Sequence, residues 1–104
     1  MLLMSETTKP AQDQEWARLI ARTAQGDQAA LATFYDLTSP QVFGFIYKIL
    51  NNREAAEEVT LDVYTQVWRQ AHIYDPTRGA PGAWLMMLAR TRAIDRFRAG
   101  DRAS

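Results

Sequence analysis

The chain has 104 residues, 47% of them hydrophobic and 23% charged, which suits one ordinary domain and excludes a disordered chain. It contains no cysteine and a single histidine, His72, which excludes disulfides, thiolate metal sites and sites built on two imidazoles. The net charge is zero, but residues 1–68 carry five basic and nine acidic side chains, whereas residues 69–104 carry seven arginines and three aspartates. This asymmetry predicts two differently charged surfaces, one of them for an anionic partner.

The N-terminal quarter of the chain predicts a tail followed by a helix. Residues 1–12 are polar after the first four and contain Lys9-Pro10, so we expect a loose N-terminal tail. Asp13 is placed to cap a first helix, and Gly26 is placed to end it.

The second predicted helix contains a possible break. Asp27 is placed to cap this helix. Ser39-Pro40 combines a capping residue with a proline and predicts that the helix restarts or kinks there. We expect Asn51-Asn52 to end it.

The segment from Glu54 to Ala71 has the clearest helical periodicity. Its apolar positions advance in alternating steps of three and one, which places them on one stripe facing a core. The stripe comprises Ala56, Val59, Thr60, Val63, Tyr64, Val67, Trp68 and Ala71.

The remaining segment predicts a loop and a last helix. Residues 72–82 contain two prolines and two glycines, and Pro81 is placed to start a helix that runs to about Arg98. Asp95 falls on the inward side of this helix, where we expect it to pair with Arg92 or Arg98. The apolar side of the helix comprises Trp84, Met87, Leu88, Thr91 and Ile94, with Leu85 on the flank. Since strand signals are absent, we predict an all-α fold, a compact bundle of four to five helices.

Leu61 interrupts the polar side of the third predicted helix. An apolar centre with a charged rim is typical of a helix face that binds a partner, although a solvated acidic face is the alternative. The rim comprises Glu57, Glu58, Asp62 and Gln66. Glu58 and Asp62 could also chelate a cation, but no histidine or facing carboxylate is spaced to complete such a site.

The loop and the last helix combine aromatic side chains with arginines. Tyr74 and Trp84 flank Arg78, and bases of single-stranded nucleic acid stack on such aromatics while guanidinium groups hold phosphates. Arg90, Arg92 and Arg96 follow on the last helix. We expect this surface and the Leu61 face to be open to solvent on separate sides of the bundle.

Catalysis is not expected from this sequence. His72 lies at a helix end without a nucleophile or partner acid spaced for it, and no glycine-rich phosphate loop is present. We therefore predict neither an enzyme nor a bound metal or cofactor. No apolar run reaches the roughly 20 residues of a membrane helix, so we expect a cytoplasmic protein without membrane insertion.

Several stretches, taken in order, resemble region 2 of extracytoplasmic-function (ECF) sigma factors, members of the sigma-70 family, and most of all the sigma-K-like group. Within the resemblance, Leu61 stands where the family commonly has Gln, and Arg90 where it commonly has His or Asn. The similar stretches are Gly26–Leu31, Phe34–Asp36, Val42–Gly44, Ala56–Tyr64, Val67–Arg69, Tyr74–Gly79, Ala83–Leu85 and Ala89–Arg98.

The resemblance implies a promoter-recognition domain of an alternative sigma factor for transcription initiation. It implies that the helix around residues 57–69 docks on the clamp helices of the largest subunit of core RNA polymerase, and that the loop and last helix recognise and melt the minus-ten element through its non-template strand. It also implies an anti-sigma factor as a partner. The alternative is a helical protein–protein interaction module without DNA binding.

The resemblance assigns the individual residues and the domain limits as follows. The implied polymerase-binding residues are Glu57, Glu58, Leu61, Asp62, Gln66 and Arg69, and the implied DNA-binding residues are Tyr74, Thr77, Arg78, Trp84, Arg90, Arg92 and Arg96. We expect residues 13–99 to form the region 2 domain and residues 100–104 to begin an interdomain linker. The second helical domain of the family, region 4, has no counterpart in the sequence, so we expect the chain to be part of a longer protein.

Overall fold

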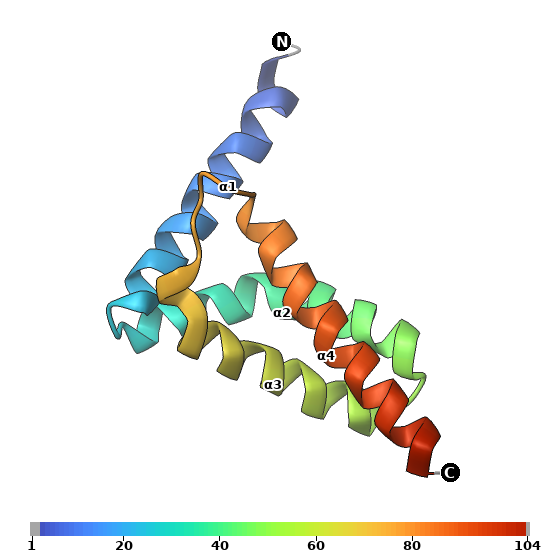
Figure 1. Cartoon of the computed structure of the whole chain (residues 1–104). Coiled ribbons are helices and arrows are strands. Elements are labelled where there is room, and N and C mark those ends of the chain that lie inside the picture. The colour runs from blue at the N-terminus through green and yellow to red at the C-terminus, as the bar shows by residue number, and fades with distance from the viewer. Residues whose placement is uncertain (1–2, 104) are drawn as a thin grey trace.

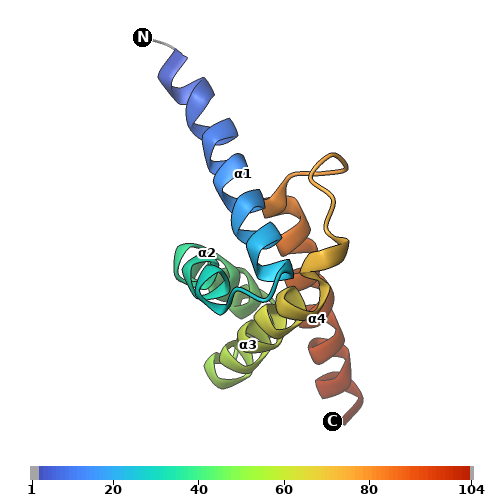
Figure 2. The same ribbon diagram turned by 90° about the vertical axis from the view of Figure 1, so that its left-hand side faces the viewer.

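In the part of the chain that the structure describes, the protein is a bundle of four α-helices with one short 3₁₀ turn, which confirms the predicted all-α class (Figure 1). The computed structural model describes the backbone of residues 3–103 and the side chains of residues 10–100. The elements are α1 (Leu3–Ala24), α2 (Gln28–Leu50), α3 (Arg53–Gln70), η1 (Ala71–Ile73) and α4 (Pro81–Ala103). The N-terminal half of α1 and the C-terminal end of α4 extend away from the bundle at opposite ends (Figures 1 and 2).

The helix ends form where the sequence places capping residues. The side chain of Asp27 accepts a hydrogen bond from the Ala30 amide, which lowers the pKa of that carboxyl and fixes the start of α2. Asn51 ends α2 in the left-handed conformation at φ 52°, and Asn52 then caps α3 by accepting from the Ala55 amide. Of these two adjacent asparagines, the first therefore ends one helix and the second starts the next.

Two helices are longer than the sequence predicts, because proline interrupts neither of them. The α1 helix begins at Leu3 instead of near Asp13 and contains Pro10, and residues 1–2 of the expected tail lie outside the described residues. The α2 helix continues through Pro40 without a restart. Proline removes one helical hydrogen bond, and the packing of the rest of a long helix can offset that loss.

The predicted stripe of α3 is confirmed at seven of its eight positions. Ala56, Val59, Thr60, Val63, Tyr64, Val67 and Ala71 are all buried. Trp68, the eighth position, has 37% of its surface exposed and lies at the edge of the stripe. The burial of this one stripe turns the opposite side of α3 to solvent.

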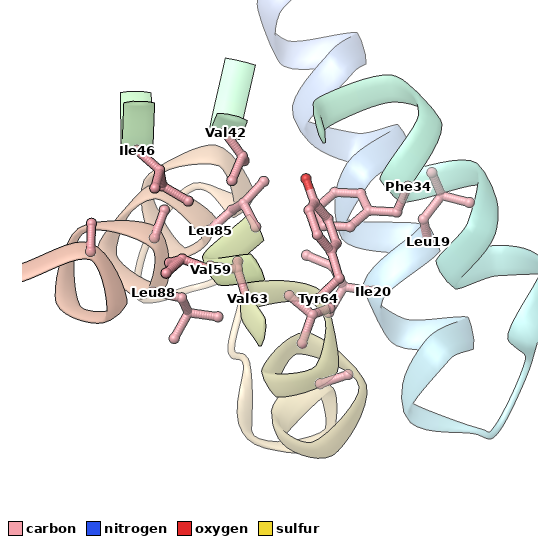
Figure 3. Close-up of a cluster of buried hydrophobic side chains, with 14 of the residues drawn as sticks. Leu19, Ile20, Phe34, Val42, Ile46, Val59, Val63, Tyr64, Leu85 and Leu88 are labelled. Atoms are coloured by element: carbon pink, nitrogen blue, oxygen red, sulfur yellow. The ribbon is translucent and has the colours of Figure 1, made fainter. Parts of the chain in front are cut away.

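The core joins all four helices around this stripe (Figure 3). Phe34 of α2 and Tyr64 of α3 meet edge to face, with ring centroids 6.3 Å apart. The Tyr64 hydroxyl shares a hydrogen bond with Thr38, and burial raises the pKa of this tyrosine to about 12. The polar atoms in this part of the core are therefore paired, as buried polar groups must be.

The inward side of α4 differs from the prediction by part of a turn. Leu85, Leu88, Ala89 and Ala93 are buried, whereas Met87 and Thr91 are exposed. Because Ala89 and Ala93 are small, α4 packs closely on α2 and α3. The buried face is therefore the one that allows the closest approach of the helices, and not the one with the largest side chains.

The expectation that Asp95 lies inward and pairs with Arg92 or Arg98 is wrong. Asp95 is exposed, so its charge stays in water and needs no partner. The α4 helix also continues beyond Arg98 to Ala103, through the segment expected to begin a linker, and Ser104 lies outside the described residues.

Among the described residues, no helix is both long enough and apolar enough to span a membrane. The same part of the chain contains no group of three or more potential metal ligands.

The neighbouring residues Met87 and Leu88 test which side of α4 is buried. Leu88 is 4% exposed and Met87 is 52% exposed. We predict that Leu88→Ala lowers the free energy of unfolding by about 2–5 kcal/mol, because it leaves a cavity. Met87→Ala serves as the control and should lower it by no more than about 1 kcal/mol. Urea denaturation measures both changes, and equal losses would contradict the observed orientation of α4.

Candidate protein-binding and nucleic-acid surfaces

The outer side of α3 carries an exposed leucine among charged side chains, as the sequence predicts. Leu61 has 58% of its surface exposed. Glu57, Glu58 and Asp62 around it are exposed too, and so is Arg69 near the end of the helix. This arrangement, an apolar centre within a charged rim, is the surface that we call the α3 face.

The α3 face continues into a groove between α3 and α2 that the sequence analysis did not identify. Leu61 lines two adjoining hollows of about 470 and 630 Å³. Tyr35 lines both of them as well, Phe43 lines the first, and Leu31 and Trp68 line the second. The half-buried positions 31 and 35 of α2 flank its buried stripe at helical spacing, which is the signal that could have indicated this groove.

Residues 74–80 form an exposed loop between η1 and α4 that runs beside α1 (Figure 2). Asp75 organises its turn, because its carboxylate accepts from both the amide and the hydroxyl of Thr77 at 2.9 and 2.7 Å. These two bonds lower the pKa of Asp75. The Arg78 amide donates to the Asp75 carbonyl at 3.0 Å, so the turn is closed from within.

Tyr74 and Trp84 lie together at the base of this loop. Their ring centroids are 5.0 Å apart at an interplanar angle of 41°. The Tyr74 hydroxyl donates to the Gly79 carbonyl at 2.8 Å. Burial, and then the nearby carboxylates of Asp13 and Asp75, raise the pKa of Tyr74, so the hydroxyl keeps the proton that it donates.

A pocket of about 320 Å³ opens beside these two rings. Its lining combines apolar groups with the cation of Arg78 and the carboxylate of Asp75, and its two aromatic rings suit a flat aromatic ligand. The lining includes Ile73, Tyr74, Arg78, Gly79, Trp84 and Met87. The sequence predicted the aromatic and arginine members of this set but not Ile73 and Met87.

The arginines of α4 fall into two groups. Arg90 is exposed and makes no ion pair within the part of the chain that the structure describes. Arg92 is half-buried, and its Nε donates to the side-chain oxygen of Gln66 at 2.8 Å. Arg96 forms an ion pair with Glu58 at 2.7 Å.

The two predicted surfaces are therefore adjacent, and the expectation that they lie on separate sides of the bundle is wrong. Gln66 and Glu58 belong to α3, whereas Arg92 and Arg96 belong to α4. The helices α3 and α4 pack against each other, and their facing edges bring these side chains together. The loop and Arg90 remain apart from this contact.

Comparison with known proteins identifies the family. The model of sigma-70 region 2 matches residues 34–103, which is more than half of the chain. The chain therefore belongs to the sigma-70 region 2 family, as the resemblance predicted.

The curated relatives are ECF sigma factors. The chain is 39% identical over 98 residues to the ECF RNA polymerase sigma factor SigK of Mycobacterium ulcerans, covering 94% of this chain and 52% of that protein. It is 46% identical over 86 residues to the protein of the same name from Mycolicibacterium vanbaalenii, covering 83% and 44%. The chain thus spans about half the length of the curated relatives it matches.

A solved structure shares the fold. The structure of Rhodobacter sphaeroides SigE in complex with the anti-sigma ChrR matches with a TM-score of 0.74 and 35% sequence identity. The match covers 84% of this chain and 54% of the other.

The ion pair between Glu58 and Arg96 can be measured by a double-mutant cycle. We predict that Glu58→Gln and Arg96→Gln show a coupling energy of about 0.5 kcal/mol at low salt, because the pair is exposed. At about 1 M salt, where the Debye length is only about 3 Å, the coupling should be smaller than at low salt. Urea denaturation of the four proteins gives the coupling energy.

Asp62 supplies the control cycle, because it forms no ion pair with Arg96 in the described residues. A coupling between Asp62 and Arg96 equal to that between Glu58 and Arg96 would show a general charge effect and contradict the specific pairing.

Proposed function

We propose that this chain is the promoter-recognition domain of an alternative RNA polymerase sigma factor. The α3 face docks on the clamp helices of the polymerase, and the loop with α4 recognises and melts the minus-ten element. The single observation that carries the proposal is the exposure of Leu61 at the centre of a charged helix face, in a chain that also presents an ordered loop with aromatic rings and an arginine. Membership of the sigma-70 region 2 family supports it.

The proposed polymerase contacts centre on Leu61. Glu57, Glu58 and Asp62 supply the acidic part of the charged rim, and Arg69 adds a cation two turns further along α3. Gln66 has a different role, because it is half-buried and its side-chain oxygen accepts a hydrogen bond from Arg92. A small apolar centre within a charged rim suits a helical partner, for which the apolar contact gives affinity and the charges give orientation.

The proposed DNA contacts come from the loop and from α4. Arg78 and Arg90 are exposed and make no ion pair among the described residues, so both can bind phosphate. Trp84 lines the pocket beside the loop, where one extruded base of the non-template strand would stack. Thr77 closes the turn from which Arg78 extends. Arg92 and Arg96 bind phosphate only after their contacts with α3 are exchanged.

The energy of melting requires the polymerase. Duplex DNA costs on average about 1.4 kcal/mol per base-pair step to separate. One base stacked on an aromatic ring returns about 1–3 kcal/mol, so the isolated chain covers one or two steps at most. We therefore expect single-stranded minus-ten DNA to bind better than duplex, and promoter binding to appear with core polymerase.

The remaining parts of the proposal concern the protein as a whole. We propose a non-enzymatic transcription initiation factor that acts in the cytoplasm, with residues 13–99 as the core of its region 2. An anti-sigma factor is the further partner proposed, because the structurally similar SigE is in complex with one.

Leu61 tests polymerase docking. We predict that Leu61→Ala weakens binding to core polymerase by at least about tenfold, the loss expected at the centre of a binding face. Leu37→Ala is the matched control, because Leu37 is a similarly exposed leucine (51%) on α2 outside both hollows. Fluorescence titration with core polymerase measures both affinities. Equal weakening by the two variants would contradict the assignment of the α3 face.

Asp62 separates docking from DNA binding. We predict that Asp62→Asn weakens binding to core polymerase while the affinity for a single-stranded minus-ten oligonucleotide stays the same, because Asp62 lies on the α3 face. If both affinities fall together, the variant is misfolded or the two surfaces are not distinct. If only the oligonucleotide affinity falls, the assignment of polymerase docking to the α3 face is wrong. That result would not support the alternative either, which is a helical interaction module without DNA binding.

Salt dependence tests the arginine contacts. If three arginines bind phosphates, the logarithm of the affinity for the minus-ten oligonucleotide should fall with the logarithm of salt concentration at a slope of about −2. Arg90→Gln should make the slope shallower by about 0.7. Arg18→Gln is the control, because Arg18 lies on α1, outside the residues proposed to contact DNA, and its guanidinium already pairs with Glu15. A slope near zero would contradict the phosphate contacts and favour the alternative function, a helical protein–protein interaction module without DNA binding.

A further inference from the structure

Tyr74 joins both ends of the loop that connects η1 to α4. Its amide donates to the Ala71 carbonyl at 3.2 Å, which ties it to η1. Its hydroxyl donates to the Gly79 carbonyl at 2.8 Å, five residues further along the chain. Its ring lies against Trp84 in the first turn of α4. One residue therefore contacts the start of the loop, its end and the helix that follows.

The segment between Tyr74 and Gly79 has few other means of keeping its shape. Asp75 and Thr77 close a local turn, but they hold only residues 75–78. No atom approaches within 4 Å of the place where a side chain of Gly79 would begin. The hydrogen bond from the Tyr74 hydroxyl therefore holds the Gly79 carbonyl at a position with open space where a side chain would begin.

The helix α1 supports the same loop from behind. Trp16 lies 3.4 Å from the position that a β-carbon on Gly82 would occupy, so α1 and the start of α4 are in close contact. Asp13 and Trp16 of α1 line a hollow together with Ala80 and Ala83. A ligand with a phosphate therefore fits the pocket beside Trp84, which Arg78 lines, better than the hollow toward α1, whose charged side chain is Asp13.

We propose that Tyr74 is a positioning residue of the DNA-recognition loop, which sets the orientation of Arg78 and Trp84 toward a single-stranded base and its phosphate. This role differs from the base stacking that the sequence suggested for Tyr74, and it rests on the proposed function. A stacking residue needs only its ring, whereas this positioning residue needs its hydroxyl. That difference makes the two roles separable by experiment.

Tyr74→Phe is the decisive variant, because it keeps the ring beside Trp84 and removes the bond to Gly79. The test compares a single-stranded minus-ten oligonucleotide with a scrambled oligonucleotide of equal length, both bound to the chain in the presence of core polymerase. We expect Tyr74→Phe to lower the affinity for the minus-ten oligonucleotide by about threefold to tenfold, the range for one neutral hydrogen bond. The affinity for the scrambled oligonucleotide should fall less, because that oligonucleotide does not place the extruded base of the minus-ten element at the pocket, so the ratio of the two affinities falls.

Tyr64→Phe is the matched control. It also removes one hydrogen bond of a tyrosine hydroxyl, but in the core, where the partner is Thr38. We expect it to lower the melting temperature and to leave the ratio of affinities unchanged. A fall of the ratio in this variant as well would show that any loss of stability produces the effect, and it would overturn the positioning role.

The outcomes separate this inference from the proposed function. If the wild-type chain prefers the minus-ten oligonucleotide and Tyr74→Phe prefers it equally, Tyr74 acts through its ring and the positioning role is wrong, while the proposed function stands. If the wild-type chain shows no preference even with core polymerase, the proposed function fails, and this inference fails with it. Faster amide hydrogen exchange at Gly79 and Ala80 in Tyr74→Phe, but not in Tyr64→Phe, is the independent supporting result.

Discussion

The burial of one stripe of α3 is the constraint on which both candidate surfaces depend. Val59, Val63 and Val67 are almost fully buried, and burying a valine side chain contributes about 1.5–3 kcal/mol. Because a helix is rigid, fixing this stripe against α1, α2 and α4 also fixes the opposite side, where Leu61 lies exposed. The same packing sets the position of α4 beside α3 and, with it, the point from which the loop of residues 74–80 extends (Figure 1). The proposed protein-binding face and the proposed nucleic-acid surface are therefore held at a defined spacing by a single core.

The contact between α3 and α4 gives the arginines of α4 unequal roles. Arg90 is free to bind phosphate, whereas Arg96 is paired with Glu58, a residue of the proposed polymerase face. A partner that binds Glu58 would release Arg96, and DNA that binds Arg96 would release Glu58. Such an exchange links the two binding events reciprocally. The coupling free energy between the two binding events is no larger than that of an exposed ion pair, so the exchange only modulates the two affinities.

The sequence predicts those parts of the fold that large or β-branched residues and capping side chains determine. The stripe of α3, the cap at Asp27 and the end of α2 at Asn51 are examples, since all three depend on local spacing. The buried side of α4 could not be predicted in the same way, because it contains Ala89 and Ala93, whose burial depends on how closely another helix approaches. The groove beside Leu61 and the bond from Tyr74 to Gly79 likewise depend on tertiary contacts, although the residues of the loop were recognised as a candidate site. Their roles in binding remain predictions.

The central claim is that polymerase and DNA bind two distinct surfaces held by one core. Because the chain contains no cysteine, single cysteines can be placed without background: Thr65→Cys beside the α3 face, Ala83→Cys at the loop pocket, and Ala24→Cys at the end of α1 as the control. The rate at which a thiol reagent modifies each cysteine is the measurement. The account predicts that core polymerase slows modification at position 65, that the minus-ten oligonucleotide slows it at position 83, and that neither affects position 24. Protection of position 65 by the oligonucleotide alone, or an unchanged rate at position 65 with polymerase, would contradict it.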